Sequence, residues 1–261
     1  MAKMLFDQDG TRKFHTGVSN FALFVRADTG ETKPAAASVG TSTRAYTCDQ
    51  SLYKEGVAWN GITTHTNSPS GGDETELWAD NIKYGSMRAA EKFGSTIECY
   101  QYPTEFDPCN GAVVVNGIVV GQQTRKKFAY AYKSNVGNDQ SSDAGEKLHL
   151  VWNASTSPSE HSDNTVNDSP DAGTFSFSCS SDSVAYTKSA NSALYKPCCT
   201  MEIDTTTLTG GKNNANYKEL CDIIYGRDAD TTANPEVTAI APQMPSPDDV
   251  LGIMARALPS G

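Results

Sequence analysis

Alternation of large apolar with small or polar side chains, at a period of two, is the feature that most constrains this chain. Residues 128–132 read Phe-Ala-Tyr-Ala-Tyr, residues 148–152 read Leu-His-Leu-Val-Trp, and residues 175–180 separate an apolar face from a hydroxyl-bearing one. Weaker versions occupy residues 96–100 and 201–204. Because successive side chains of a strand point to opposite faces, this spacing predicts strands with one face on a core. Together they predict a mainly β fold, either a β-sandwich or a barrel.

Two helices are predicted near the C-terminus. Residues 217–224 carry apolar side chains at helical spacing, which predicts one helix flanking the β structure. Asn213 or Asn214 is a suitable N-cap, and Gly226 stands where a C-terminal glycine belongs. Residues 246–249 read Ser-Pro-Asp-Asp, which is typical of the start of a short helix.

The remaining segments are predicted to be turns and loops. Asn116-Gly117 lies between two Val/Ile runs and indicates a tight β-turn. Residues 27–56 read as a long loop or an inserted hairpin, and residues 60–76 and 134–147 read as flexible loops. Loops longer than about 12 residues in a compact domain are usually functional, ordered by a partner, or disordered. A weaker helical stretch is expected around residues 87–93.

Composition excludes several classes of protein. The chain has 261 residues, with 21 Lys+Arg, 31 Asp+Glu and a net charge of −10. Tight phosphate binding needs clustered cations, so a basic nucleic-acid binder is excluded. The longest apolar runs, 112–115 and 118–120, fall far short of the roughly 20 residues of a membrane-spanning helix. The N-terminal sequence lacks the apolar core of a signal peptide, so synthesis in the cytosol is expected.

No pattern for catalysis or metal binding is found. The seven cysteines include no Cys-x-x-Cys pair, which weakens zinc and redox interpretations and favours buried or inert thiols. No nucleophile elbow and no His-Glu-x-x-His motif is present. Four histidines lack metal-ligand spacing: His15, His65, His149 and His161. We therefore expect neither enzymatic activity nor a cofactor.

The most specific pattern is a series of short blocks in a fixed order. The first blocks are Gly56-Val57-Ala58-Trp59-Asn60-Gly61-Ile62, Ser68-Pro69-Ser70-Gly71, Trp78-Ala79-Asp80-Asn81-Ile82-Lys83-Tyr84 and Phe93-Gly94-Ser95-Thr96-Ile97-Glu98-Cys99-Tyr100. The later blocks are Tyr102-Pro103-Thr104-Glu105-Phe106, Gly121-Gln122-Gln123-Thr124-Arg125-Lys126-Lys127-Phe128, Asn167-Asp168-Ser169-Pro170, Ile224-Tyr225-Gly226 and Pro245-Ser246-Pro247-Asp248-Asp249-Val250. In this order the chain resembles the major tail protein, or tail tube protein, of siphophages, which are bacteriophages with a long non-contractile tail. The resemblance covers about residues 15–25 and 56–255, while residues 27–56 are longer than the family pattern.

The resemblance implies a single tail tube domain over residues 1–261. It would have an N-terminal arm (about 1–20), an inserted loop (about 27–56) and a C-terminal extension (about 227–261). The residues that carry the family motif are Trp59, Asn60, Trp78, Asp80, Asn81, Gln122 and Gln123. The candidate loop for assembly and ring stacking consists of Thr66, Asn67, Ser68, Pro69, Ser70, Gly71, Gly72 and Asp73.

The resemblance also implies a structural function in the virion, without catalysis or cofactor. Copies of the chain would form hexameric rings that stack into a tube, assembled in the cytoplasm of the host bacterium. The partners would be the tape-measure protein, the tail terminator and the distal tail or baseplate proteins, with no membrane anchoring. Genomic DNA would pass through as cargo that is not bound specifically. Six copies would carry about −60 per ring, a charge that repels phosphate and favours passage.

Two other classes stay open from the sequence. One is a different tube-fold component, such as a tail terminator or the tube of another injection device. The other is a carbohydrate-binding β-sandwich, in which Trp59, Trp78 and Tyr102 would form a platform for a sugar ring. Packing in a core or an interface is the more common role of such aromatic side chains.

Overall fold

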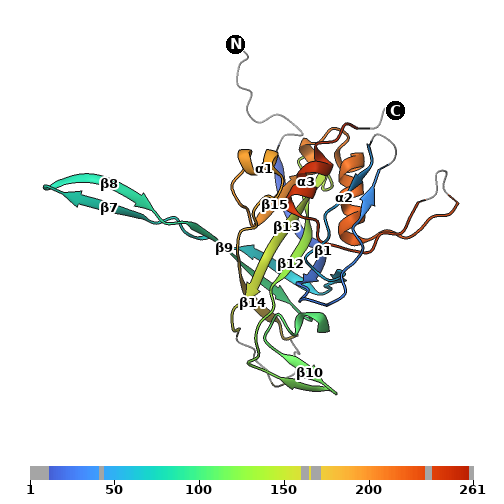
Figure 1. Ribbon diagram of the computed structural model, residues 1–261, viewed down its shortest axis with the longest axis horizontal. Coiled ribbons are helices and arrows are strands. Elements are labelled where there is room, and N and C mark those ends of the chain that lie inside the picture. The colour runs from blue at the N-terminus through green and yellow to red at the C-terminus, as the bar shows by residue number, and fades with distance from the viewer. Residues whose placement is uncertain (1–11, 41–43, 160–164, 166–171, 233–236, 259–261) are drawn as a thin grey trace, which may run out of the picture.

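A single antiparallel sheet dominates the computed structural model, which describes residues 12–40, 44–159, 165, 172–232 and 237–258. Its strands follow the order β4-β1-β12-β13-β14-β9-β5 (Figure 1). Their bounds are β1 (Lys13–Val25), β4 (Val57–Ala58), β5 (Ile62–Asn67), β9 (Glu91–Cys99), β12 (Phe128–Asn138), β13 (Gly145–Thr156) and β14 (Phe175–Ser181). Two further strands join the sheet: β15 (Thr200–Asp204) pairs with β13, and β6 (Ser70–Gly71) pairs with β9. The fold is mainly β, as the alternation predicts.

The sheet curls until its two ends approach each other, and we call this curled sheet the barrel. One edge of β13 serves two partners, since residues 147–151 pair with β15 and residues 154–156 pair with β14. Where the ends meet, the Trp59 backbone N–H donates to the Phe21 carbonyl at 2.8 Å. The Phe21 ring contacts the rings of Trp59 and His65. The segment from Trp59 to the start of β5 therefore lies beside β1, where the two ends of the sheet meet.

Large side chains at alternate strand positions fill the barrel. Phe128, Tyr130 and Tyr132 of β12 belong to this inner core, together with Trp59 and Phe106. The rings of Trp59 and Phe106 lie 4.5 Å apart between centroids, and Phe106 meets Phe128 edge to face. Such tilted and edge-to-face arrangements are those that aromatic rings prefer. The interior is a packed core, so a channel lined by this protein has to lie outside the barrel of one chain.

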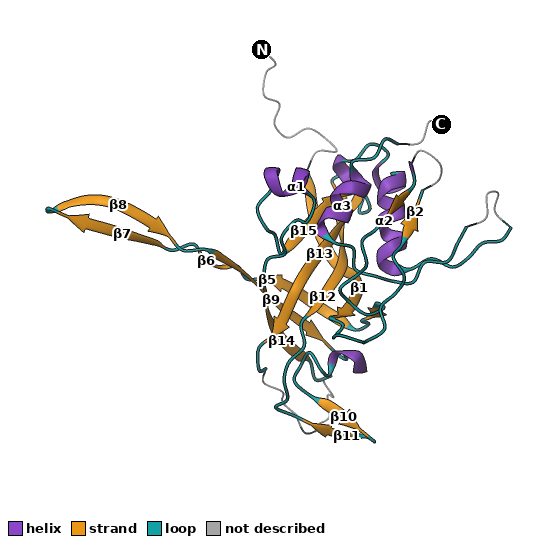
Figure 2. Cartoon of the chain, viewed as in Figure 1, coloured by secondary structure: helices purple, strands orange, loops and turns teal. Residues whose placement is uncertain are grey.

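The opposite face of the same strands carries the helices (Figure 2). Ala129 and Ala131 of β12 point outward, and their small side chains leave room for α2 (Ala215–Tyr225) and α3 (Pro247–Met254). Leu220 of α2 is fully buried in this second core. The large-small alternation at residues 128–132 thus reflects a strand buried on both faces, with a wide barrel core on one side and a close helix layer on the other.

Both predicted helices are confirmed, with their caps. The Asn214 side chain accepts from the Tyr217 backbone N–H at 3.1 Å, and Gly226 after the last turn has φ 84. Ser246 and Asp249 form a reciprocal capping box at the start of α3. One helix, α1 (Ser189–Leu194), is not anticipated by the sequence pattern. Short 3₁₀ turns complete the helical structure at η2 (Thr104–Phe106), η3 (Thr205–Thr207) and η4 (Gly211–Asn213).

The predicted strands are confirmed as well, since all five alternating segments lie in β9, β12, β13, β14 and β15. Three further two-stranded sheets lie outside the barrel: β2 (Ser38–Val39) with β3 (Tyr46–Thr47), β7 (Glu74–Ala79) with β8 (Ile82–Arg88), and β10 (Val113–Val115) with β11 (Ile118–Val120). The predicted turn at Asn116-Gly117 joins the last pair, with φ of 50 and 80. Positive φ at both central residues defines a type I′ turn.

Three local predictions are wrong. Residues 87–93 are not helical but contain the end of β8 and the start of β9. Residues 60–76 are not a loop, because β5, β6 and the start of β7 pair with β9 and β8. Residues 134–147 are mostly strand, since β12 continues to Asn138 and β13 begins at Gly145. In each segment the large apolar side chains are too few and too widely spaced for a period of two to be detected.

The inserted loop and the C-terminal extension pack on the helix side of the barrel. Within residues 27–56, Val39 and Tyr53 are buried in the outer core. The Asp249 carboxylate of α3 accepts from the Tyr46 hydroxyl at 3.1 Å and from the Asp49 backbone N–H at 3.3 Å. Residues 13–20, expected as part of an N-terminal arm, are instead the first half of β1 and pair with β12; residues 1–11 lie outside the described part.

Candidate assembly interface

A two-stranded arm extends from the barrel and is the most conspicuous feature of the surface (Figure 1). The chain leaves the barrel along β5 and β6, forms β7 and β8, and returns along β9. The turn at the tip consists of Asp80 and Asn81, whose φ values of 50 and 62 give a type I′ geometry. Asp and Asn tolerate this left-handed conformation better than most residues, so the local sequence supports a sharp reversal here.

Two glycines allow the strands to approach closely at the base of the arm. A Cβ on Gly94 would lie 2.5 Å from the Ser68 carbonyl oxygen, and one on Gly71 would lie 2.6 Å from that of Ala90. Gly71 also has φ 88, which other residues rarely adopt. The predicted assembly loop, residues 66–73, therefore forms the stem of the arm, while its tip lies farther along the chain at Asp80-Asn81.

The arm has one apolar and one charged face. Cross-strand pairing places Thr75 opposite Met87, Leu77 opposite Gly85 and Ala79 opposite Ile82. Directly opposed residues share a face of the sheet, so these six form the apolar face. Exposure of the large apolar side chains of the arm runs from 40% at Leu77 to 78% at Tyr84.

Charged groups occupy the other face of the arm. Lys83 Nζ lies 2.7 Å from a Glu76 carboxylate oxygen and 3.8 Å from one of Glu74, and Arg88 lies 3.7 Å from Glu74. The Trp78 indole N–H donates to Glu76 at 3.2 Å. Exposed ion pairs contribute little stability, typically below about 1 kcal/mol each. They do not compensate for an apolar face that stays in water, and such a face is typical of a docking surface.

The residues of the family motif fall in different environments. Trp59 is only 2% exposed, and its indole N–H donates to the Gln101 carbonyl at 2.9 Å inside the barrel core. Trp78 is 64% exposed on the arm, next to the Asp80-Asn81 turn. The other five members are all exposed, among them Asn60 beside Trp59 and Gln122 at φ 58. The Gln123 backbone N–H donates to the Gly111 carbonyl at 2.9 Å, which closes the base of the β10–β11 hairpin.

The three aromatic residues considered for sugar binding are not brought together. Trp59 is buried, and Trp78 lies on the arm. Tyr102 packs edge to face against Phe175 and Phe177, with centroids 5.1 and 5.5 Å apart. These positions do not form a shared platform on which a sugar ring can stack.

A pocket of about 250 Å³ at one mouth of the barrel collects histidines that are far apart in sequence: His15, His65 and His149. His65 Nε2 lies 3.0 Å from the Tyr130 hydroxyl, and the His149 ring stacks on Tyr132 at 4.5 Å. Burial lowers the pKa of His65 to about 4 and also lowers the pKa of His149. The His65 imidazole is therefore neutral at pH 7. Within the described residues, no three His, Cys, Asp or Glu side chains are arranged to hold a metal ion.

The cysteines are all free thiols in the structure. Cys48, Cys99, Cys109 and Cys179 are buried, and burial raises the pKa of each of these thiols. High pKa values keep a thiol protonated and unreactive. The expectation of buried thiols is confirmed for these four.

Sequence reasoning did not predict the exposure of the β10–β11 hairpin, which we call the valine hairpin (residues 113–120). Its six strand residues are all apolar and between 44% and 66% exposed. The signal in the sequence is the lack of alternation on either side of Asn116-Gly117, but all-apolar runs are also typical of strands buried on both faces, so the sequence alone does not reveal the exposure.

A scan against models of known protein families returned no match, and a sequence search of curated proteins returned none either. No helix within the described part of the chain combines the length and the apolar character that crossing a membrane requires.

Proposed function

We propose that this protein is a structural subunit of a siphophage tail tube. Copies would assemble into stacked, hexameric rings and form the conduit through which the genome leaves the virion. The chain would be made and assembled in the cytoplasm of the host bacterium and would end up in the virion tail. The observation that carries the proposal is the arm, whose apolar face no described residue of the same chain covers.

An isolated two-stranded hairpin is marginally stable in water, so the arm needs a partner to bury its apolar face. The arm differs in shape from the compact barrel that bears it, so its contact with a second copy joins two different surfaces. Head-to-tail contacts of this kind generate rings or open filaments, whereas symmetric contacts close into dimers. An arm that projects beyond its own barrel therefore supports repeated assembly.

The resemblance to siphophage tail proteins supports the same function. Its blocks include the Asp80-Asn81 turn that ends the arm and the glycines that let its strands approach. In the virion the proposed partners at the two ends of the tube are the terminator and the distal tail or baseplate proteins, with the tape-measure protein inside before DNA passes. A net charge of −10 per chain suits a conduit that does not retain DNA.

Electron microscopy of the purified full-length protein tests the proposal. We expect hollow tubes of stacked rings to form as concentration rises. Single rings that never stack would favour the tail terminator, and glycan binding by a persistent monomer would favour a carbohydrate-binding protein.

A shortened arm provides the matched variant. The Ala89 backbone N–H donates to the Asp73 carbonyl at 3.0 Å, so these two residues already face each other across the arm. Replacing residues 74–88 by Asn-Gly keeps this pair and closes it with a two-residue turn. We expect a folded monomer that forms no tubes. Lys83→Gln, on the charged face, serves as the control and should still assemble; normal tubes from the shortened chain would contradict the proposal.

A further inference from the structure

The valine hairpin is a second apolar projection, and it differs from the arm in having no charged face. Val113, Val114 and Val115 pair with Val120, Val119 and Ile118, and all six side chains are exposed. Residues 111–124 contain no charged side chain. The hairpin lies at the end of the barrel opposite the helices (Figure 2). Because both of its faces are apolar, laying it on a flat surface would leave one face in water, so its shape requires a recess.

The base of the valine hairpin does not suit a lipid surface. Binding to anionic lipid draws on free cations next to the apolar segment. Three cations follow the hairpin, and each is engaged by the protein itself. Arg125 donates to the Thr156 hydroxyl at 2.7 Å, Lys126 lies 2.5 Å from an Asp28 carboxylate oxygen, and Lys127 is paired with Asp182. A protein recess is therefore the better match.

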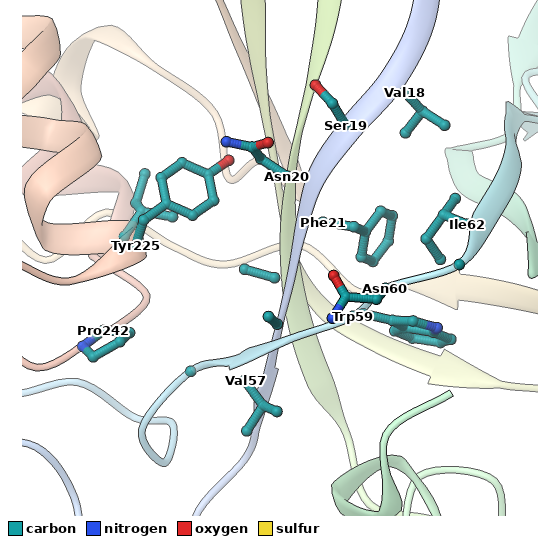
Figure 3. Close-up of a pocket in the computed structure, with 15 residues that line it drawn as sticks. Val18, Ser19, Asn20, Phe21, Val57, Trp59, Asn60, Ile62, Tyr225 and Pro242 are labelled. Atoms are coloured by element: carbon teal, nitrogen blue, oxygen red, sulfur yellow. The ribbon is translucent and has the colours of Figure 1, made fainter. Parts of the chain in front are cut away.

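The same chain has a pocket lined by uncharged residues, which we call the β1 pocket. It has a volume of about 520 Å³ and lies between β1, the segment around β4 and the end of α2 (Figure 3). None of its fifteen lining residues is charged, and none belongs to the valine hairpin. On a chain with a net charge of −10, two uncharged surfaces are where two copies can meet with the least repulsion.

The backbone of the β1 pocket is prepared for another strand. β4 pairs with β1 only at Ala22 and Leu23, and within the described residues no strand is hydrogen-bonded to the first half of β1 on that edge. Gly17 and Asn20 have φ of 66 and 50, and the pairing of β1 with β12 shifts register on either side of Ser19. Such bulges leave backbone groups of β1 without ladder partners.

An unpartnered hydroxyl group at the pocket gives a second, independent indication of a missing partner. The Tyr225 hydroxyl is buried and makes no hydrogen bond. In Figure 3 the ring of Tyr225 reaches from α2 toward Asn20 on β1. Buried polar groups nearly always have a partner, and a missing one is costly. A strand added along β1 would bring backbone carbonyls to this side of the pocket.

We propose that the valine hairpin of one copy inserts into the β1 pocket of a second copy. The inference deepens the proposed function, on which it rests, by assigning a contact between subunits separate from that of the arm. The apolar side chains fill the pocket, and the free edge of the hairpin extends the sheet at the unpaired half of β1. Because the valine hairpin and the β1 pocket are different surfaces of the chain, each copy can use both, and the contact repeats from copy to copy.

Photocrosslinking in the full-length protein tests the inference directly. Val119 is replaced by p-benzoylphenylalanine, ¹⁵N-labelled and unlabelled protein are mixed under assembly conditions, and irradiated products are mapped by mass spectrometry. We expect mixed-isotope crosslinks to residues 18–22, 56–62 or 224–225. Tubes that form while Val119 crosslinks elsewhere would overturn the inference and leave the proposed function standing. A chain that stays monomeric at every concentration would contradict both.

Two variants separate this contact from a folding defect. Ala58 is exposed and lines the pocket, so Ala58→Phe should fill it and lower the crosslinked fraction at least tenfold. Ala190→Phe, at an exposed position of α1 outside the pocket, should leave that fraction unchanged. Thermal unfolding of both monomers should match the parent chain. If the crosslinked fraction does not fall in Ala58→Phe, the inference is overturned. A second measurement adds phosphatidylcholine–phosphatidylglycerol vesicles. If the vesicles bind the hairpin and the crosslink is lost, the inference is overturned as well.

Discussion

The barrel and the arm share a strand but bury their side chains in opposite ways. At its barrel end β9 contributes Ile97 and Cys99, which are fully buried, whereas its first residues Glu91 and Lys92 lie exposed on the arm. In the barrel, every inward position meets another side chain of the same chain. On the arm, the apolar face has no such neighbour among the described residues. One region is therefore stabilised within the monomer, and the other gains its apolar burial only from a partner.

Trp59 and Trp78 give the largest expected contrast between the two regions. Truncating a buried aromatic side chain typically costs about 3–5 kcal/mol, so Trp59→Ala should destabilise the monomer by that amount. Trp78→Ala should change the free energy of unfolding by about 0.5 kcal/mol or less, as for other exposed positions. Urea unfolding of both monomers measures the difference. Equal destabilisation by the two substitutions would break the comparison.

The second-largest expected effect is the pH dependence of the free energy of unfolding that His65 causes. Its pKa is about 4 in the folded barrel, against an ordinary value of 6.5, because burial disfavours the imidazolium. The unfolded chain thus binds more protons between these values, so stability is complete above pH 6.5 and falls as the pH drops toward 4. The linkage amounts to at most about 3 kcal/mol. The pH dependence of urea unfolding should be shallower in His65→Gln; an unchanged slope would contradict a buried neutral His65.

Gly94 tests the place where the arm joins the barrel. A Cβ there would overlap the Ser68 carbonyl oxygen at 2.5 Å, and the Ser68 backbone N–H donates to the Gly94 carbonyl at 2.8 Å, which fixes the two residues against each other. We expect Gly94→Ala to cost about 1–3 kcal/mol, in the range of other overpacking substitutions. Gly85, in β8 of the arm, has no atom within 4 Å of such a Cβ, so Gly85→Ala is the matched control and should be close to neutral. Hydrogen exchange should show faster opening of the arm in the first variant alone.

Lys83 gives the smallest effect. Its ammonium group lies between Glu74 and Glu76 on the charged face of the arm, and all three side chains are exposed. Lys83→Gln should lower monomer stability by no more than about 0.5 kcal/mol, because water and salt screen the pair. A larger loss, measured by thermal unfolding at low and high salt, would mean that the arm is stabilised by its own charges.

The sequence predicts the barrel better than the arm, for a physical reason. At residues 128–132, the large side chains face the barrel core and the small ones face the helix layer. The alternation in the sequence therefore predicts the burial of this strand. Residues 74–79 read Glu-Thr-Glu-Leu-Trp-Ala, and Trp78 on the charged face interrupts the alternation, so no comparably long pattern develops. The helix expected at residues 87–93 fails similarly, since Met87 and Phe93 belong to different strands joined through Ala89 and Ala90.

The candidate interface was located only in part. The polar stretch 66–73, predicted as the assembly loop within the long segment 60–76, forms the stem of the arm. Its apolar face depends on pairing with residues 82–88, which sequence spacing alone does not reveal. The lack of a hydrogen bond at the buried Tyr225 hydroxyl also cannot be predicted from the sequence. The helical spacing of α2 predicts only that a side chain at its C-terminal end is buried.

The continuity of β9 from arm to barrel has a mechanical consequence. A pull along the arm acts parallel to β9, whose barrel segment is hydrogen-bonded to β14 on one side and to β5 on the other. The load therefore falls on both ladders in shear, so many hydrogen bonds have to break together. Peeling, in which they break one after another, would need a force across the strands. A tether built this way resists tension along its length and yields most easily when it is bent sideways.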